Sequence, residues 1–137
     1  VLCGLRGWCC WLGFIFVGDV VMREVKFRAW NNLDKKMVNH VHALPLFNNL
    51  LKSKYYNLMQ YSGIKDINGV EIYEGDIVEE RRKNSCWPAD MVQNLEVKFE
   101  RGKFIVGKNS DLHGSIGVTY KVIGNKYENP ELLEQLR

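Results

Sequence analysis

The sequence predicts an all-β fold, with an N-terminal β-hairpin region, a small β-barrel and a short C-terminal helix. Short segments in which apolar and polar residues alternate predict half-buried strands. Glycine and asparagine residues separate these segments at the spacing of tight turns, which is typical of a small barrel. The chain has 137 residues, of which 46% are hydrophobic and 26% charged. It therefore has room for one domain or two very small ones, with a modest core.

The first two strands are expected to form a hairpin. Residues 25–30 alternate in the period-two pattern of a strand, and residues 31–36 supply turn chemistry. Residues 37–42 would then return antiparallel to the first strand. In residues 44–54, a proline and a pair of asparagines interrupt any helix or strand, so no regular element is expected there.

Two turn signals follow the next predicted strand, residues 55–61. Asn68-Gly69 predicts a tight hairpin, because a type I′ turn needs positive φ at both central positions and these residues tolerate it best. Glu74-Gly75-Asp76 predicts a second sharp bend, and residues 77–79 form a strand after it.

In residues 95–136 the sequence predicts a hairpin, a further strand and a helix. Arg101-Gly102 turns the chain between two runs that should pair with each other. Asn129 is a helix cap and Pro130 suits the first helical position, so residues 131–136 should form one or two helical turns. The three strand segments are residues 95–100, 104–106 and 118–122.

The first 21 residues differ from the rest in composition. They hold three of the four cysteines and two of the four tryptophans. Their uncharged stretch, residues 7–18, is shorter than the roughly 20 apolar residues that span a bilayer, and no small-residue cleavage site follows it. We interpret this segment as an over-extended, non-native start, with translation beginning at Met22. The predicted divisions are 1–21, an N-terminal β region at 22–60, and the barrel with its helix at 61–137.

The charge and cysteine content indicate in which cellular compartment the protein acts and which kinds of partner it can bind. Nineteen basic and sixteen acidic residues give a net charge of +3, far below that of a dedicated nucleic-acid coat. From Met22 onward only Cys86 remains, so no disulfide framework is available. With no convincing export signal or membrane span, we expect the cytoplasm of the host cell and no membrane partner.

Four motifs occur in a characteristic order and spacing. They are Lys26–Trp30, Asn57–Asp66, Asn68–Val78 and Val122–Leu133. Together they strongly resemble the YopX-like proteins of phages and prophages in Gram-positive bacteria. The resemblance extends from Met22 to Leu133 and is weakest at residues 44–54 and 83–94. It implies an SH3-like barrel in the second half of the chain, and it implies no reaction, cofactor or catalytic residue.

Nine residues in these motifs are expected to have structural roles. The glycines suit positions where a side chain would obstruct a turn, and the aspartate suits hydrogen bonds to backbone amides of a turn. The aromatic residues belong either to the core or to a groove. The nine residues are Trp30, Tyr61, Gly63, Gly69, Tyr73, Gly75, Asp76, Gly124 and Asn125.

Catalysis and metal binding have little support. His40 and His42 would share one face of a strand, but a third metal ligand is missing. Cys86 has no base placed near it in the sequence, so it is interpreted as a loop thiol. Glu79 and Glu80 would point to opposite faces of a strand, which suits exposure better than acid–base work. We expect no enzyme, no cofactor and no metal.

Binding is the remaining function class, with three alternatives. The first is a module that contacts a host or phage protein, because an exposed strand edge can accept an added strand. The second is nucleic-acid binding through Arg81, Arg82, Lys83 and Trp87, in which basic groups hold phosphates and the indole stacks a base. The third is a homo-oligomeric structural component formed through edge strands.

Overall fold

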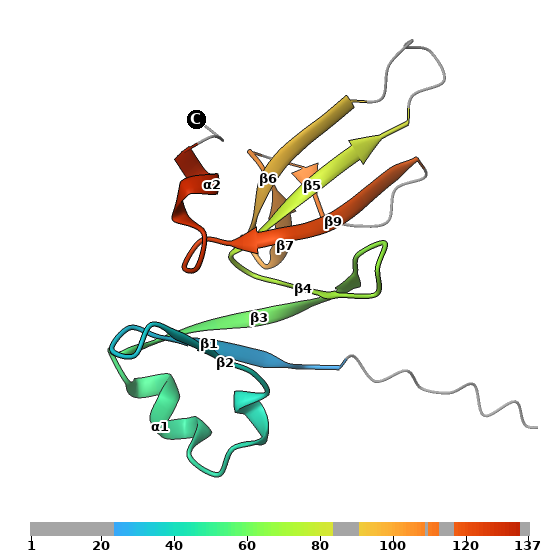
Figure 1. Cartoon of the computed structure of the whole chain (residues 1–137). Helices are drawn as coiled ribbons and strands as arrows, with labels where there is room; N and C mark the ends of the chain where they lie inside the picture. Colours follow the sequence, from blue (N-terminus) through green and yellow to red (C-terminus); the bar gives the residue numbers. More distant parts are fainter. Residues whose placement is uncertain (1–23, 84–90, 109, 113–116, 135–137) are drawn as a thin grey trace, which may run out of the picture.

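The computed structural model describes residues 24–83, 91–108, 110–112 and 117–134 (Figure 1). Within these ranges nine strands form two antiparallel sheets, accompanied by short helices. The prediction of a mainly β fold with a short C-terminal helix is confirmed, whereas the SH3-like detail stays a prediction. The expectations for residues 1–21, Cys86 and Trp87 lie outside the described residues.

The first sheet contains the predicted N-terminal hairpin, and its strand order is β2-β1-β3-β4. The strands are β1 (Phe27–Asn31), β2 (Lys36–Val38), β3 (Tyr56–Lys65) and β4 (Glu71–Tyr73). The register of β3 shifts between Tyr61 and Lys65, where Gly63 has a φ of 86°. Such an irregularity requires a residue that adopts left-handed backbone angles without strain. The predicted division at residue 60 lies inside β3, whose first half pairs with β1.

The segment after β2 differs from the sequence prediction. His40 has a φ of 55°, and a short 3₁₀ helix η1 (Val41–Ala43) follows it. The expectation that His40 and His42 share one strand face is therefore wrong, because β2 ends before them. His42 Nδ1 instead accepts a hydrogen bond from the Phe27 N–H at 3.1 Å.

A helix forms in the segment where none was expected. Helix α1 (Phe47–Lys52) includes the asparagine pair that was interpreted as an interruption. Pro45 precedes the helix, so its ring interrupts no helical hydrogen bond. The ring of Phe47 lies 5.4 Å from that of Phe27 in β1. This tertiary contact compensates for the low helix propensity of asparagine.

The turn at Asn68-Gly69 is present, but the predicted type I′ geometry is wrong. Gly69 has a φ of 81°, whereas Asn68 does not have positive φ. The Asp66 carboxylate sets this geometry, because its Oδ1 accepts hydrogen bonds from the Asn68 N–H at 2.8 Å and from the Val70 N–H at 2.9 Å. Its other oxygen accepts the Val122 N–H at 3.0 Å, so Asp66 also ties the turn to a strand of the second sheet.

The second sheet has the strand order β8-β7-β6-β5-β9. Its strands are β5 (Asp76–Arg82), β6 (Met91–Glu100), β7 (Lys103–Val106), β8 (Ser110–Asp111) and β9 (Val118–Asn125), and helix α2 (Pro130–Glu134) follows. The predicted hairpin between β6 and β7 is confirmed. Its turn has positive φ at both Arg101 (52°) and Gly102 (78°), the pattern of a type I′ turn.

Two apolar clusters stabilise the fold. The larger joins Ile72 of β4 to the interior of the second sheet and contains Val78, Val97, Phe104, Val106, Leu112 and Tyr120. The smaller contains Trp30, Met59, Tyr61 and Tyr73, so three of the motif aromatics are buried together. Trp30 also stacks on Tyr127, with ring centroids 5.6 Å apart. The two sheets therefore depend on each other for burial of apolar surface.

Replacing Asp66 by alanine is expected to destabilise the protein by about 2–4 kcal/mol, because backbone N–H groups at three positions lose their acceptor. Urea unfolding measures the loss. Asp34→Ala is the matched control, because Asp34 is exposed and accepts a hydrogen bond from the Asn31 side chain. Equal losses for the two variants would contradict this role of Asp66.

Stability is expected to fall as the pH rises from about 10 to 12. Burial, and then a hydrogen bond to Glu71, raise the pKa of Tyr73 from 10.0 to about 12. The unfolded chain therefore loses this proton at a lower pH than the folded protein, and stability decreases between the two pKa values. Tyr73→Phe should flatten the dependence of the free energy of unfolding on pH in this window. An unchanged slope would exclude Tyr73 as the source.

Candidate binding groove

Half of β6 lacks a neighbouring strand on one side. β5 pairs with Met91 to Glu96, but β7 pairs only with the part that begins at Val97. The Gly107 N–H donates to the Glu96 carbonyl at 3.2 Å, so the backbone of Glu96 faces away from β5. Because backbone groups alternate along a strand, those of Val92 and Asn94 face the same side. In the described part of the chain, no strand pairs with them there.

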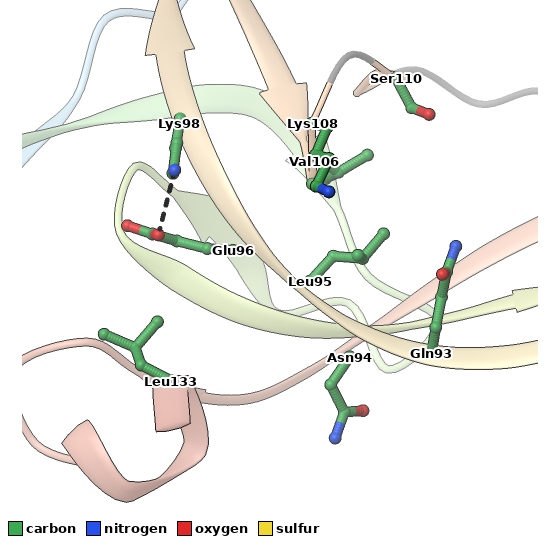
Figure 2. A pocket seen from close by; sticks show the side chains of 10 residues that line it. Gln93, Asn94, Leu95, Glu96, Lys98, Val106, Lys108, Ser110 and Leu133 are labelled. Carbon is green, nitrogen blue, oxygen red and sulfur yellow. Dashed lines mark ion pairs between the residues drawn. The ribbon is translucent and has the colours of Figure 1, made fainter. Parts of the chain in front are cut away.

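A cavity of about 760 Å³ lies along this edge (Figure 2). Asn94 and Glu96 line it from one face of β6, and Gln93 and Leu95 line it from the other. Residues from both faces of one strand can line one cavity only around that strand's edge. Leu133 of α2 lines the cavity on the side of Asn94 and Glu96. The side of Gln93 and Leu95 is also lined by Val106, Gly107, Lys108 and Ser110. Lys98 is the remaining lining residue. We call this cavity the β6 groove.

The charges along the β6 groove have a positive balance. Glu96 is the one acid among the described lining residues, and its carboxylate oxygens lie 3.6 Å from Lys98 Nζ and 3.8 Å from Lys126 Nζ. Lys108 is exposed and also lines the groove. The glutamate charge is therefore already compensated by two lysines, and Lys108 adds a further positive charge.

A buried carboxylate lies behind the inner wall of the β6 groove. Glu80 is 0% exposed, so the expectation that it suits exposure is wrong. Gln93 Nε2 donates to Glu80 Oε2 at 2.6 Å, and Arg82 Nη2 lies 3.0 Å from Oε1. Tyr120 of β9 lies opposite Glu80 in the strand register. Burial of the tyrosine, and then the charge of Glu80, raise the pKa of Tyr120. Gln93 and Tyr120 come from other strands, so the neighbouring sequence alone does not reveal the burial of Glu80.

Of the four predicted nucleic-acid residues, the structure describes Arg81, Arg82 and Lys83. Arg81 and Arg82 are adjacent on β5 and project to opposite faces. Arg81 lies 3.6 Å from Glu79, and Arg82 is paired with the buried Glu80. Lys83 is exposed just after β5, and its N–H donates to the Gly117 carbonyl at 2.8 Å. Both arginine charges are therefore compensated by a neighbouring acid.

The bend before β5 positions the strand that supports the groove. Gly75 has a φ of 80°, and its N–H donates to the Val97 carbonyl of β6 at 2.8 Å. Asp76 Oδ2 accepts the Tyr73 N–H at 2.8 Å, and Asp76 Oδ1 forms an ion pair with Arg28. Asp76 thus makes the predicted kind of turn hydrogen bond and also connects the two sheets.

A second motif positions the helix that contributes Leu133. Gly124 leaves room for the Asn129 side chain, whose Oδ1 would lie 2.6 Å from a Cβ at this position. Asn125 Oδ1 accepts the N–H groups of residues 127 and 128 at 3.1 and 2.9 Å. These contacts fix the turn between β9 and α2, and so they place Leu133 beside the β6 groove.

In residues 24–83, 91–108, 110–112 and 117–134, no group of three histidine, cysteine, aspartate or glutamate side chains is arranged to hold a metal ion. No helix in the same ranges is long and apolar enough to span a membrane.

Comparisons with known proteins identify the family. A family model described as YopX protein matches residues 45–134, and the chain therefore belongs to this family. The chain is also similar to the crystal structure of protein EF1440 from Enterococcus faecalis, with 28% sequence identity and a TM-score of 0.56. That similarity covers 82% of this chain and 99% of the other. The comparison with curated proteins found no match.

Glu80→Ala is expected to lower stability by about 1–3 kcal/mol, because the Gln93 amide loses its buried acceptor and the partly exposed Arg82 loses its ion-pair partner. Glu79→Ala on the opposite face removes a more exposed pair and should cost less than about 1 kcal/mol. Chemical denaturation of the two variants measures the difference. A similar small loss for both would show that the Glu80 cluster is not a stabilising element.

Proposed function

We propose that this protein is a non-catalytic binding module that holds an extended segment of a partner protein in the β6 groove. The observation that carries the proposal is the cavity of about 760 Å³, lined from both faces of β6 along its unpaired half. An extended segment that adds to a sheet edge needs backbone donors and acceptors together with space for its side chains on both faces. The β6 groove has both features.

The dimensions and lining of the groove support this mode of binding. Val92 and Asn94 each direct one N–H and one C=O toward the groove, as strand addition requires. Leu95, Val106 and Leu133 supply apolar surface around this edge. At about 3.3 Å per residue, the free half of β6 accommodates a segment of roughly five residues.

Family membership supports a host or phage protein as the partner, with a phage-encoded accessory protein acting in the host cytoplasm. Nucleic-acid binding has weaker support, because Arg81 and Arg82 project to opposite faces of β5. Self-association through the same edge is the third alternative. The experiment below distinguishes the three.

Selection from a display library of random peptides, followed by titration of the selected peptides, tests the proposal. Asn94→Pro removes one edge N–H without removing a hydrogen bond to β5, because that N–H faces the groove. We expect about fivefold weaker binding, which corresponds to the loss of one hydrogen bond of about 1 kcal/mol. Asn94→Ala is the matched control, because it shortens the side chain and keeps the N–H, and it should bind nearly as well as the original protein.

Three outcomes would contradict binding of a partner protein's segment at this edge. Selected peptides that bind Asn94→Pro as well as the original protein would place their site elsewhere. Salt-sensitive binding of labelled DNA or RNA that is lost in Arg81→Ala, with no peptide selected, would favour a nucleic-acid interface. A concentration-dependent dimer that Asn94→Pro dissociates would assign the edge to self-association.

A further inference from the structure

We infer that the β6 groove selects an extended segment that carries an acidic side chain, which Lys108 and Arg82 would bind. This inference rests on the proposed function and adds the chemistry of the partner. The backbone edge of a strand accepts any extended sequence, so selectivity must come from the side chains around it. Among the described residues near this groove, the cationic groups Arg82, Lys98, Lys108 and Lys126 outnumber the acidic groups Glu80 and Glu96.

Lys108 is the first of the two cationic groups. It is exposed and lines the β6 groove on the side of Val106 and Ser110. The acid of the groove, Glu96, is engaged by Lys98 and Lys126 instead. Within the ranges that the structure describes, Lys108 has no acidic side chain as an ion-pair partner. A carboxylate on a bound segment would supply one.

Arg82 is the second cationic group, and it lies at the end of the groove marked by Ser110. Its Nη2 is 3.5 Å from Ser110 Oγ, and its side chain is 42% exposed. The hydrogen bonds to Glu80 and Ser110 both use Nη2. A guanidinium has five N–H groups, so donors remain for a carboxylate of a ligand.

Glu80 is a positioning residue for this arginine. Its carboxylate is fully buried and is held from the other side by Gln93, which itself lines the β6 groove. The pair restrains a side chain that otherwise has several rotatable bonds. Less rotational freedom is then lost when Arg82 binds a ligand.

A second copy of this chain is a poorer occupant than an acidic segment of another protein. Self-pairing along the free edge would bring residues 91–95 of another copy into the groove. Residues 91–95 contain no acidic side chain, and Glu96 beside them is already engaged by Lys98 and Lys126. This stretch would leave Lys108 and Arg82 without a carboxylate.

The test uses peptides selected by the full chain from the random display library. Selected sequences should be enriched in glutamate and aspartate. For one selected peptide, replacing its acidic residue by the neutral amide should weaken binding about threefold to tenfold at low salt, and less at high salt. Lys108→Gln should reduce this difference, because only Arg82 then remains to bind the acidic group, and should leave binding of the amide peptide unchanged. Lys103→Gln is the matched control, because Lys103 is an exposed lysine of β7 outside the groove lining and pairs with Asp111.

Arg82→Gln should also reduce the preference, but it leaves Glu80 buried without its cationic partner. Lys108→Gln, at an exposed position, therefore keeps the test independent of folding. Equal binding of the acidic and amide peptides, with Asn94→Pro still weakening both, would overturn the acidic selectivity and leave the proposed function intact. If Asn94→Pro changes neither titration, the proposed function itself fails.

Discussion

The ion pair between Arg28 of β1 and Asp76 of β5 holds the two sheets in their arrangement. Asp76 is 1% exposed, and burial raises its pKa against the opposing effects of Arg28 and the Tyr73 amide. The Arg28 guanidinium lies over the Tyr73 ring, 4.6 Å from its centroid. Removing either partner of a buried pair typically costs about 3–5 kcal/mol, because the remaining charge has no compensation. The contact therefore fixes a specific orientation of the sheets, whereas apolar packing alone tolerates small displacements.

The β6 groove depends on this arrangement through β5. Asp76 is the first residue of β5, the strand against which the free half of β6 is paired. The same strand carries Glu80 and Arg82, which support the inner wall of the groove. On the β9 side of β5, Asp76 lies opposite Asn125 of β9. Asn125 also shapes the turn that leads to α2. One position thus orients both walls of the groove.

The sequence predicts those elements that form because of a few adjacent residues. The turn of the β6–β7 hairpin at Arg101-Gly102 and the helix start at Pro130 follow from two or three adjacent residues, although the type of that turn was not predicted. Prediction fails where a distant partner decides the outcome. Helix α1 depends on the contact of Phe47 with Phe27, and burial of Glu80 depends on Gln93. The groove was not predicted as a site, because an unpaired edge becomes visible only when the ends of both neighbouring strands are known.

The short length of the free edge limits how long a complex can last. Within the described ranges, Val92 and Asn94 are the two residues of β6 whose backbone groups face the groove without a partner there, since the Glu96 carbonyl accepts from Gly107. Each net hydrogen bond contributes about 1 kcal/mol, so the edge alone gives a weak complex. Weak complexes of this kind differ from tight ones mainly in dissociation rate. A guest segment would therefore exchange rapidly, which suits a protein that samples several partners in succession more than one that builds a permanent assembly.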